Sequence, residues 1–164
     1  MAGIGRPSFS LIDHRGQEVS EASFPGKWLM VYFGFTHCRV VCPRSLSRLS
    51  AVLEALPHEI SKAIQALYIS VDPERDTPEV MKAYLEAQYP RFTGLTGSMT
   101  QIDAAKSSFK VFAERKPDAE DPDGYAVPHT SIAYLIDPAG NYATHWVETK
   151  SIDEITADLK ARLA

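Results

Sequence analysis

Two apolar runs joined by a helical segment limit this chain to an α/β fold. The first run, "WLMVYFGF" (28–35), and the second, "AIQALYISVD" (63–72), are almost continuously apolar or aromatic. Such runs are typical of strands that are buried on both faces of a sheet. Between them, apolar residues recur at helical spacing from Leu46 to Leu56, and Pro57 then ends the helix. Because strand–helix–strand crossovers are right-handed, we expect the two strands to be parallel.

The rest of the sequence continues this alternation. Helices are predicted over 76–90, 100–112 and 151–163, and in the first of them we expect Thr77 as the N-cap and Pro78 as the first helical residue. Two hairpins are predicted over 8–20 and 130–147. The segment 113–128, rich in Pro, Asp and Glu, is expected to form an irregular loop or a small hairpin. The sequence therefore predicts one domain, 1–164, with a layered α/β fold.

Length and charge exclude several classes of function. The chain has 164 residues, which is enough for one domain with its own core. Its formal net charge is −4 and it has no run of Lys or Arg, so nothing favours nucleic acid as a partner. The longest apolar stretch falls far short of the ~20 residues of a membrane-spanning helix. The first residues do not have the pattern of a signal peptide.

Both cysteines of the chain lie in "GFTHCRVVCP" (34–43), where the first apolar strand gives way to the helix that begins near Val41. In an open α/β sheet, ligands usually bind in the crevice beyond the carboxyl ends of the strands. Cys38 and Cys42 therefore stand where a functional site is expected.

The cysteine pair has three interpretations. Free cysteines often fill cores, but this does not explain two of them four positions apart beside Arg39 and Arg44. As a redox pair, Cys38 would be the nucleophile, because the positive end of a helix dipole stabilises a thiolate, and Cys42 would resolve it. The spacing is C-x-x-x-C, however, and not the usual C-x-x-C. As metal ligands, positions i and i+4 share a helix face, and two thiolates favour copper(I), zinc or an iron–sulfur cluster.

A metal site would need a third ligand, for which the sequence offers five histidines: His14, His37, His58, His129 and His145. His14 lies in a polar turn and His58 follows a helix-ending proline, so both are expected at the solvated surface. His145 lies in a predicted strand and could face either way. His37 is adjacent to the first cysteine, and adjacent side chains of an extended segment point in opposite directions. His129 follows a loop and starts a predicted strand, from which it can reach across a crevice, so it is the strongest candidate.

Three blocks of sequence, in order, resemble the Sco/SenC family, named for the synthesis of cytochrome c oxidase: "YFGFTHCRVVCPRSL", "ISVDPERDTPEVMKAY" and "YAVPHTSIAYLIDPAGNY". The resemblance covers the chain from about Phe9 to the C-terminal helix. It implies a thioredoxin-like (peroxiredoxin-like) three-layer fold, with a central mixed sheet between helices, an N-terminal β-hairpin and an insertion at about 113–128. Carried over by position, it implies copper ligands at Cys38, Cys42 and His129.

The resemblance also implies a function. Members of the family bind copper and help to assemble the copper centre of cytochrome c oxidase, as metal donors or as reductants of its cysteines. The partner would be the copper-bearing subunit of the oxidase, or another copper or thiol protein, and we expect a monomer. Family members are held by an N-terminal helix on the periplasmic side of the inner membrane or in the mitochondrial intermembrane space. We expect such an anchor to lie outside these 164 residues.

Three residues depart from the family's usual pattern. Arg39 and Val40 stand where the motif C-P-D-x-C-P has Pro and Asp, and Pro128 stands where an Asp precedes the histidine. Bound copper(II) would lose nearby negative charge, whereas thiolates and copper(I) would be affected less. Pro128 also lies where thioredoxin-like proteins commonly have a cis-proline, so the Val127–Pro128 bond is a candidate for the cis form. Copper binding is the first hypothesis, and thiol–disulfide exchange by the two cysteines is the alternative.

The matched stretch "VDPERDTP" (71–78) is interpreted as scaffold. Asp72 and Pro73 are expected to end a strand. Arg75 and Asp76 are expected to form an ion pair or to cap the helix that follows.

Overall fold

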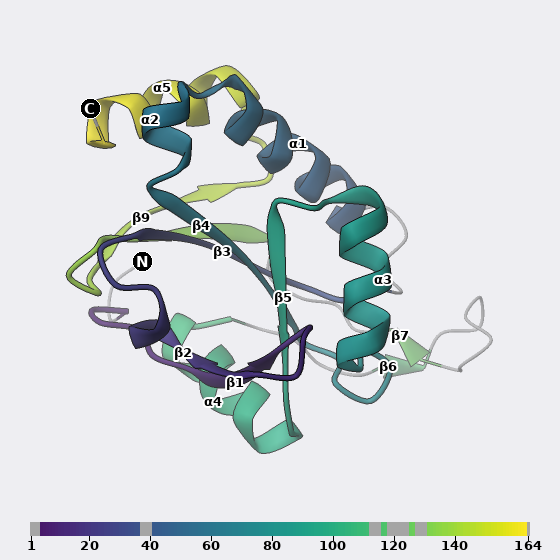
Figure 1. Cartoon of the computed structure of the whole chain (residues 1–164). Coiled ribbons are helices and arrows are strands. Elements are labelled where there is room, and N and C mark those ends of the chain that lie inside the picture. The colour runs from purple at the N-terminus through teal and green to yellow at the C-terminus, as the bar shows by residue number, and fades with distance from the viewer. Residues whose placement is uncertain (1–3, 37–40, 112–115, 118–124, 127–130, 164) are drawn as a thin grey trace.

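In this computed structural model, seven strands form one mixed sheet in the order β2-β1-β5-β4-β3-β8-β9 (Figure 1). The structure describes residues 4–36, 41–111, 116–117, 125–126 and 131–163. The strands of the sheet are β1 (Ser10–Asp13), β2 (Glu18–Ser20), β3 (Trp28–Gly34), β4 (Ile64–Ser70), β5 (Phe92–Thr96), β8 (Ile132–Ile136) and β9 (Tyr142–Val147). The helices are the 3-10 helix η1 (Glu21–Ser23) and α1 (Val41–Ala55), α2 (His58–Ser61), α3 (Pro78–Gln88), α4 (Met99–Phe109) and α5 (Ile152–Leu163).

The centre of the sheet is parallel, and the predicted parallel pairing of the strands at 28–35 and 63–72 is confirmed. β3 pairs with β4, and β4 pairs with β5, in parallel. On the other side of β3, β8 runs antiparallel to it and forms a hairpin with β9. The antiparallel hairpin of β1 and β2 joins the outer side of β5. The two predicted hairpins and the layered α/β fold are therefore confirmed.

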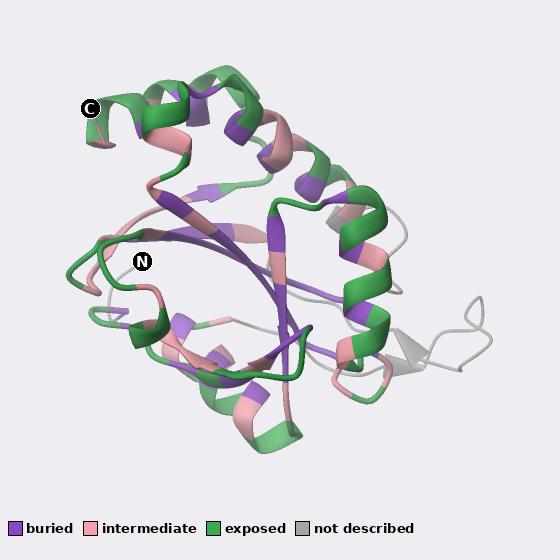
Figure 2. Cartoon of the chain, viewed as in Figure 1, coloured by how far each residue is buried: buried purple, intermediate pink, exposed green. Residues whose placement is uncertain are grey.

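Helices cover both faces of the sheet. On one face, α1, α3 and α5 share a core cluster with the strands through side chains that include Leu49, Leu85 and Leu159. On the other face, α4 packs through Ile102 and Phe109 into a second cluster. Figure 2 shows that buried residues follow the central strands and the inner sides of the helices. Because β3 and β4 are covered on both faces, their sequences are continuous apolar runs instead of alternating ones.

The helix boundaries follow local capping chemistry. Pro78 opens α3, and the Thr77 side chain accepts a hydrogen bond from the Val80 amide, which confirms the predicted N-cap. α1 ends at Ala55, and Pro57 is the N-cap of the short helix α2. None of the helices in the described part of the chain is long and apolar enough to span a membrane.

One strand has no signal in the sequence patterns. β5 reads "FTGLT", with Gly94 in its middle. A Cβ atom at Gly94 would lie 2.8 Å from Cδ1 of Leu85 and 2.9 Å from Cε of Met81, both on α3. The glycine is therefore needed for the close packing of α3 on β5, and this need outweighs the low strand preference of glycine.

Within the insertion, the described residues pair as a small hairpin, one of the two predicted alternatives. β6 (Lys116–Pro117) pairs antiparallel with β7 (Tyr125–Ala126). In Figure 1 this hairpin lies at the right of the molecule, on the side where α1 begins.

Candidate thiol and metal site

The cysteine segment connects the end of a buried strand to the start of a helix, as the sequence predicts. β3 ends at Gly34, and α1 begins at Val41, so Cys42 is the second residue of the helix. The first turn of a helix carries unpaired amide groups and a partial positive charge, which stabilise a thiolate. The backbone position of Cys42 is therefore suited both to redox chemistry and to metal binding.

The end of β3 lies beside the start of β8. The two strands are antiparallel, with Tyr32 opposite Ala133. The carboxyl end of β3 and the amino end of β8, which begins at Ile132, are therefore at the same edge of the sheet. His129 precedes this strand start by three positions in the sequence.

The three predicted ligands are only partly within the described residues. Cys38, His129 and the Val127–Pro128 bond lie outside them, and for Cys42 only the backbone is described. The close approach of Cys38, Cys42 and His129 therefore stays a prediction. Among the described residues, no group of three or more His, Cys, Asp or Glu side chains is arranged to hold a metal ion.

Two tyrosines fix the chain on either side of this edge. The hydroxyl group of Tyr32, on β3, is 3.1 Å from Oγ of Ser131 and shares a hydrogen bond with it. The hydroxyl of Tyr89 donates a longer hydrogen bond, 3.4 Å, to the carbonyl oxygen of Pro43 in the first turn of α1. Residues next to both candidate ligand segments are therefore held by side chains of the core.

A buried carboxylate, Asp76, also reaches this edge. It accepts a hydrogen bond from the amide of Thr36 at 3.0 Å and another from Oγ1 of Thr36. A third comes from Oγ of Ser70, at the end of β4, at 2.7 Å. Burial raises the pKa of the Asp76 carboxyl above its usual range, although the hydrogen bonds from Thr36 and Ser70 act in the opposite direction.

The neighbouring ion pair corrects one expectation. Arg75 pairs with Asp72, and both side chains are almost fully buried. The guanidinium also lies 5.9 Å from the ring centre of Phe35. The prediction that Arg75 forms an ion pair is confirmed, but its partner is Asp72 and not Asp76, and Asp76 does not cap α3, since Thr77 fills that position.

The described histidines lie away from this edge or serve the scaffold. The prediction of a solvated His14 is wrong: its side chain is buried, and Nδ1 accepts a hydrogen bond of 3.0 Å from the Gly94 amide. The buried amide of Gly94, in the middle of β5, needs a hydrogen-bond acceptor. This need explains why His14, a polar residue in a turn, is buried. His58 is exposed, as expected. His145 is half-buried, and its Nδ1 shares a hydrogen bond with the hydroxyl of Tyr142.

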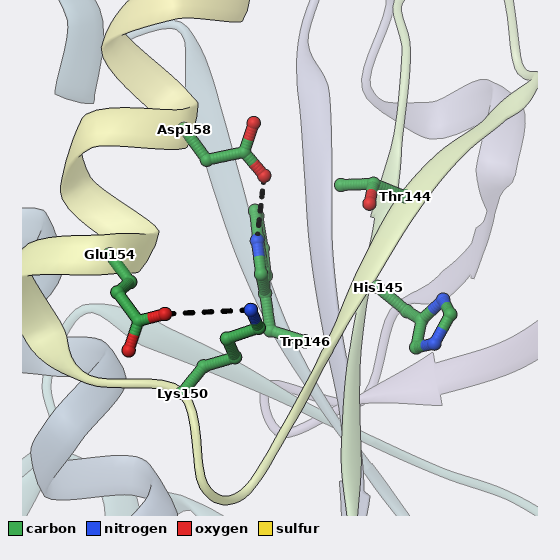
Figure 3. Close-up of a pocket in the computed structure, with 6 residues that line it drawn as sticks. All are labelled: Thr144, His145, Trp146, Lys150, Glu154 and Asp158. Atoms are coloured by element: carbon green, nitrogen blue, oxygen red, sulfur yellow. Dashed lines mark hydrogen bonds and ion pairs between the residues drawn. The ribbon is translucent and has the colours of Figure 1, made fainter.

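A separate cavity of about 480 Å³ lies between β9 and α5 (Figure 3). In it, Nε1 of Trp146 donates to Asp158 at 2.9 Å, and Lys150 pairs with Glu154. The ring of His145 points away from this space in Figure 3. Asp158 also pairs with Arg162 on the same helix, so each charged side chain that lines the cavity has a partner among the described residues and none is assigned to the predicted chemistry.

Sequence patterns did not find Thr36 and Asp76 as residues of this region. One signal was present, because Asp76 directly precedes a threonine that caps the helix by itself. Because Thr77 already caps the helix, the acidic residue before it has no local role. This indicates that Asp76 has a hydrogen-bond partner distant in sequence.

A mixed sheet with helices on both faces, and a cysteine in the first helical turn after a central strand, defines a protein of the thioredoxin-like class. Comparisons with known proteins identify the family within this class. The family model described as SCO1/SenC matches residues 3–164. The chain therefore belongs to the SCO1/SenC family, which confirms the resemblance found in the three sequence blocks.

The relatives agree in sequence and in fold. The chain is 40% identical over 164 residues to the mitochondrial protein SCO2 homolog of Bos taurus, covering 99% of this chain and 61% of that protein. Copper-bound ScoI of Bradyrhizobium japonicum is 39% identical, with a TM-score of 0.84 and coverage of 96% and 98%. Yeast Sco1 is 30% identical, with a TM-score of 0.87 and coverage of 97% of each chain. The chain thus spans about three fifths of the length of the curated mammalian relative.

Proposed function

We propose that this protein binds copper as cargo and helps to assemble the copper centre of cytochrome c oxidase. Cys38, Cys42 and His129 would be the ligands. The observation that carries the proposal is the antiparallel pairing of β3 with β8, since it brings the segments next to the cysteines and next to the histidine to one sheet edge. The copper bound to the related ScoI of Bradyrhizobium japonicum supports copper as the metal.

The donor set suits this cargo. Thiolates are soft ligands that favour copper(I), and an imidazole accommodates either oxidation state of copper. The start of α1 favours the thiolate form of Cys42, which is the form that binds metal. A site at the end of a sheet, and not inside the core, leaves room for a partner protein to exchange its ligands for those of the donor.

The partner would be the copper-bearing subunit of the oxidase, or another copper or thiol protein. The mitochondrial relative supports an intermembrane-space location, or the periplasmic side of the inner membrane in a bacterium. We expect one domain that acts as a monomer and is held to the membrane by a segment beyond these 164 residues.

The second candidate is a thiol–disulfide oxidoreductase. The position of Cys42 as the second residue of α1 favours it, with Cys38 four positions earlier as the attacking thiolate. Cys38 would form a mixed disulfide with a partner cysteine, displacing the partner's other thiolate. Cys42 would then attack Cys38, releasing the partner thiol and leaving a Cys38–Cys42 disulfide.

An anaerobic copper(I) titration against a competing chelator tests the first candidate. We expect the fully reduced protein to bind one copper tightly, Cys38→Ser to lose most of this affinity, and His129→Ala to weaken it while losing most copper(II) affinity. The exposed His58 gives a matched control, since His58→Ala should bind copper as the parent does. No copper(I) binding by the intact protein, or unchanged copper(II) binding in His129→Ala, would contradict the proposed site.

The second candidate has its own test. A Cys42→Ser variant should trap a mixed disulfide between Cys38 and a partner peptide that contains a disulfide. Repeated failure to trap any such species, in the presence of a reactive Cys38, would contradict oxidoreductase activity.

A further inference from the structure

A carboxylate that is fully buried needs a reason to be there, because removing a charge from water is costly unless hydrogen bonds replace the lost solvent. The Asp76 residue has 0% exposure. Its carboxylate accepts three hydrogen bonds from described residues, and two of them come from one residue, Thr36, 40 positions earlier in the chain. The carboxylate thus joins two segments distant in sequence.

The nearby helix and ion pair do not account for this carboxylate. The N-cap of α3 is the Thr77 side chain, which accepts from the Val80 amide. The nearby Arg75 forms its ion pair with Asp72.

The opposite side of Asp76 is tied to the sheet. Oγ of Ser70, the last residue of β4, donates to its carboxylate at 2.7 Å. Oγ1 of Thr96, the last residue of β5, donates to its backbone carbonyl oxygen at 2.9 Å. Asp76 is therefore anchored to the ends of two central strands, and its carboxylate reaches the chain just beyond the end of the third.

Thr36 is two residues after the end of β3 and two residues before Cys38. Its amide and its hydroxyl group both donate to the same carboxylate, so its backbone position and its side-chain rotamer are fixed together. The chain beyond β3 is therefore held at Thr36, the last described residue before the first cysteine.

We propose that Asp76 is a positioning residue that holds Thr36 and thereby pre-orders the segment carrying Cys38. This inference rests on the proposed function, in which Cys38 is a ligand. A segment that is already ordered loses less conformational entropy when copper binds. Asp76 would therefore raise copper affinity without touching the metal.

The experiment compares Thr36→Val, which removes only the hydroxyl donor, with Thr36→Ser, which keeps both donors. Asp76→Asn tests the acceptor. Asp137→Asn is the matched control, because the Asp137 carboxylate accepts from the amides of Ala139 and Asn141 in the turn at the opposite end of β8. All variants are studied at a temperature well below their unfolding transitions.

The first measurement is amide hydrogen exchange of the reduced, metal-free protein, followed by mass spectrometry of peptides that cover residues 34–42. We expect exchange of this segment to be faster in Thr36→Val and Asp76→Asn, and unchanged in Thr36→Ser and Asp137→Asn. The second measurement is the copper(I) titration, in which we expect Thr36→Val to bind about tenfold more weakly, the effect of one hydrogen bond to a charged group. Thr36→Ser should restore the affinity.

The outcomes separate this inference from the proposed function. If Thr36→Val and Asp76→Asn unfold at lower temperature but keep the parent's exchange rates at 34–42, Asp76 is a stability residue only and the inference is overturned. Faster exchange with unchanged copper(I) affinity overturns it too. If the intact protein binds no copper(I), the proposed function fails, while the exchange data still decide whether Asp76 orders the cysteine segment.

Discussion

Tyr32 and Ser131 share a hydrogen bond of 3.1 Å between residues 99 positions apart. Tyr32 belongs to the central strand that precedes the cysteines, and Ser131 lies two positions after His129 in the sequence. The bond thus joins the cysteine side of the candidate site to its histidine side. The contribution of this bond to the free energy of unfolding can be measured by comparison with a tyrosine whose hydroxyl lacks such a bond.

For this comparison, we expect Tyr32→Phe to lower the free energy of unfolding by about 1 kcal/mol, the typical net value of one hydrogen bond. The control is Tyr134→Phe. The buried hydroxyl of Tyr134 has no hydrogen-bond partner among the described residues, and burial raises its pKa to about 12. Its removal should leave stability unchanged or raise it. Equal losses in the two variants, measured by urea denaturation, would contradict a specific role for the Tyr32–Ser131 bond.

A second prediction concerns the buried His14, whose Nδ1 must be unprotonated to accept from the Gly94 amide. Burial lowers the pKa of His14 below its usual value, against the opposing effect of Glu86 and Asp13 and with the help of Arg15 and Lys82. The unfolded chain therefore takes up this proton more readily than the folded one. The contribution of His14 to the stability of the folded protein is complete above the usual histidine pKa of about 6.5. It is lost as the pH falls toward the lower pKa of the folded state.

The free energy of unfolding, measured in urea at several pH values, checks this expectation. His14→Gln keeps a hydrogen-bond acceptor but does not titrate, so its stability should fall less than the parent's between neutral pH and pH of about 5. The exposed His58→Gln variant should keep the parent's pH dependence. A His14→Gln protein with the same pH dependence as the parent would refute the assignment.

A third prediction tests the packing of α3 on β5. Gly94→Ala would bring a Cβ atom to 2.8 Å from Leu85 and 2.9 Å from Met81, side chains that are themselves fully buried. We expect a loss of about 1–3 kcal/mol in the free energy of unfolding, as for other overpacked cores. At Gly97 the new Cβ would meet chiefly the flexible end of Gln101, so Gly97→Ala should cost less. The reverse order of the two losses, in thermal or urea unfolding, would show that α3 moves aside easily.

A fourth prediction concerns charge at the proposed metal site. Val40→Asp places a carboxylate between the two cysteines, as in the family's usual motif. We expect copper(II) affinity to rise severalfold, with a smaller change for copper(I), because the higher metal charge gains more from a nearby anion. Val80→Asp, at an exposed position on α3, is the control and should change neither affinity. Equal gains for both oxidation states would count against an effect of local charge.

Sequence patterns predicted the elements whose physics is local. The apolar runs of β3 and β4 indicated doubly covered strands, and the Thr77–Pro78 pair placed the start of α3 to the residue. The start of the helix near Val41 was also correct, because it is set by the change of pattern after β3.

What the patterns missed depends on contacts between distant segments. β5 contains a glycine because α3 lies close above it, and His14 is buried because a β5 amide needs an acceptor. The link from Asp76 to Thr36 spans 40 positions, so no local window could contain both residues. In the candidate site, the sequence supplied the residue types and their spacing, whereas the framework around them arises only in three dimensions.

The pairing of β3 with β8 has a consequence for the folding of the newly synthesised chain. The segment with the cysteines is synthesised before the strand that follows His129, and that strand pairs with β3 although the two lie far apart in the sequence. Pairings between segments so far apart in sequence form slowly, because the entropy lost in bringing them together must be overcome first. Under the proposed function, a nascent or partly folded chain would offer copper two sulfur ligands without the nitrogen, so tight loading would itself report that folding is complete.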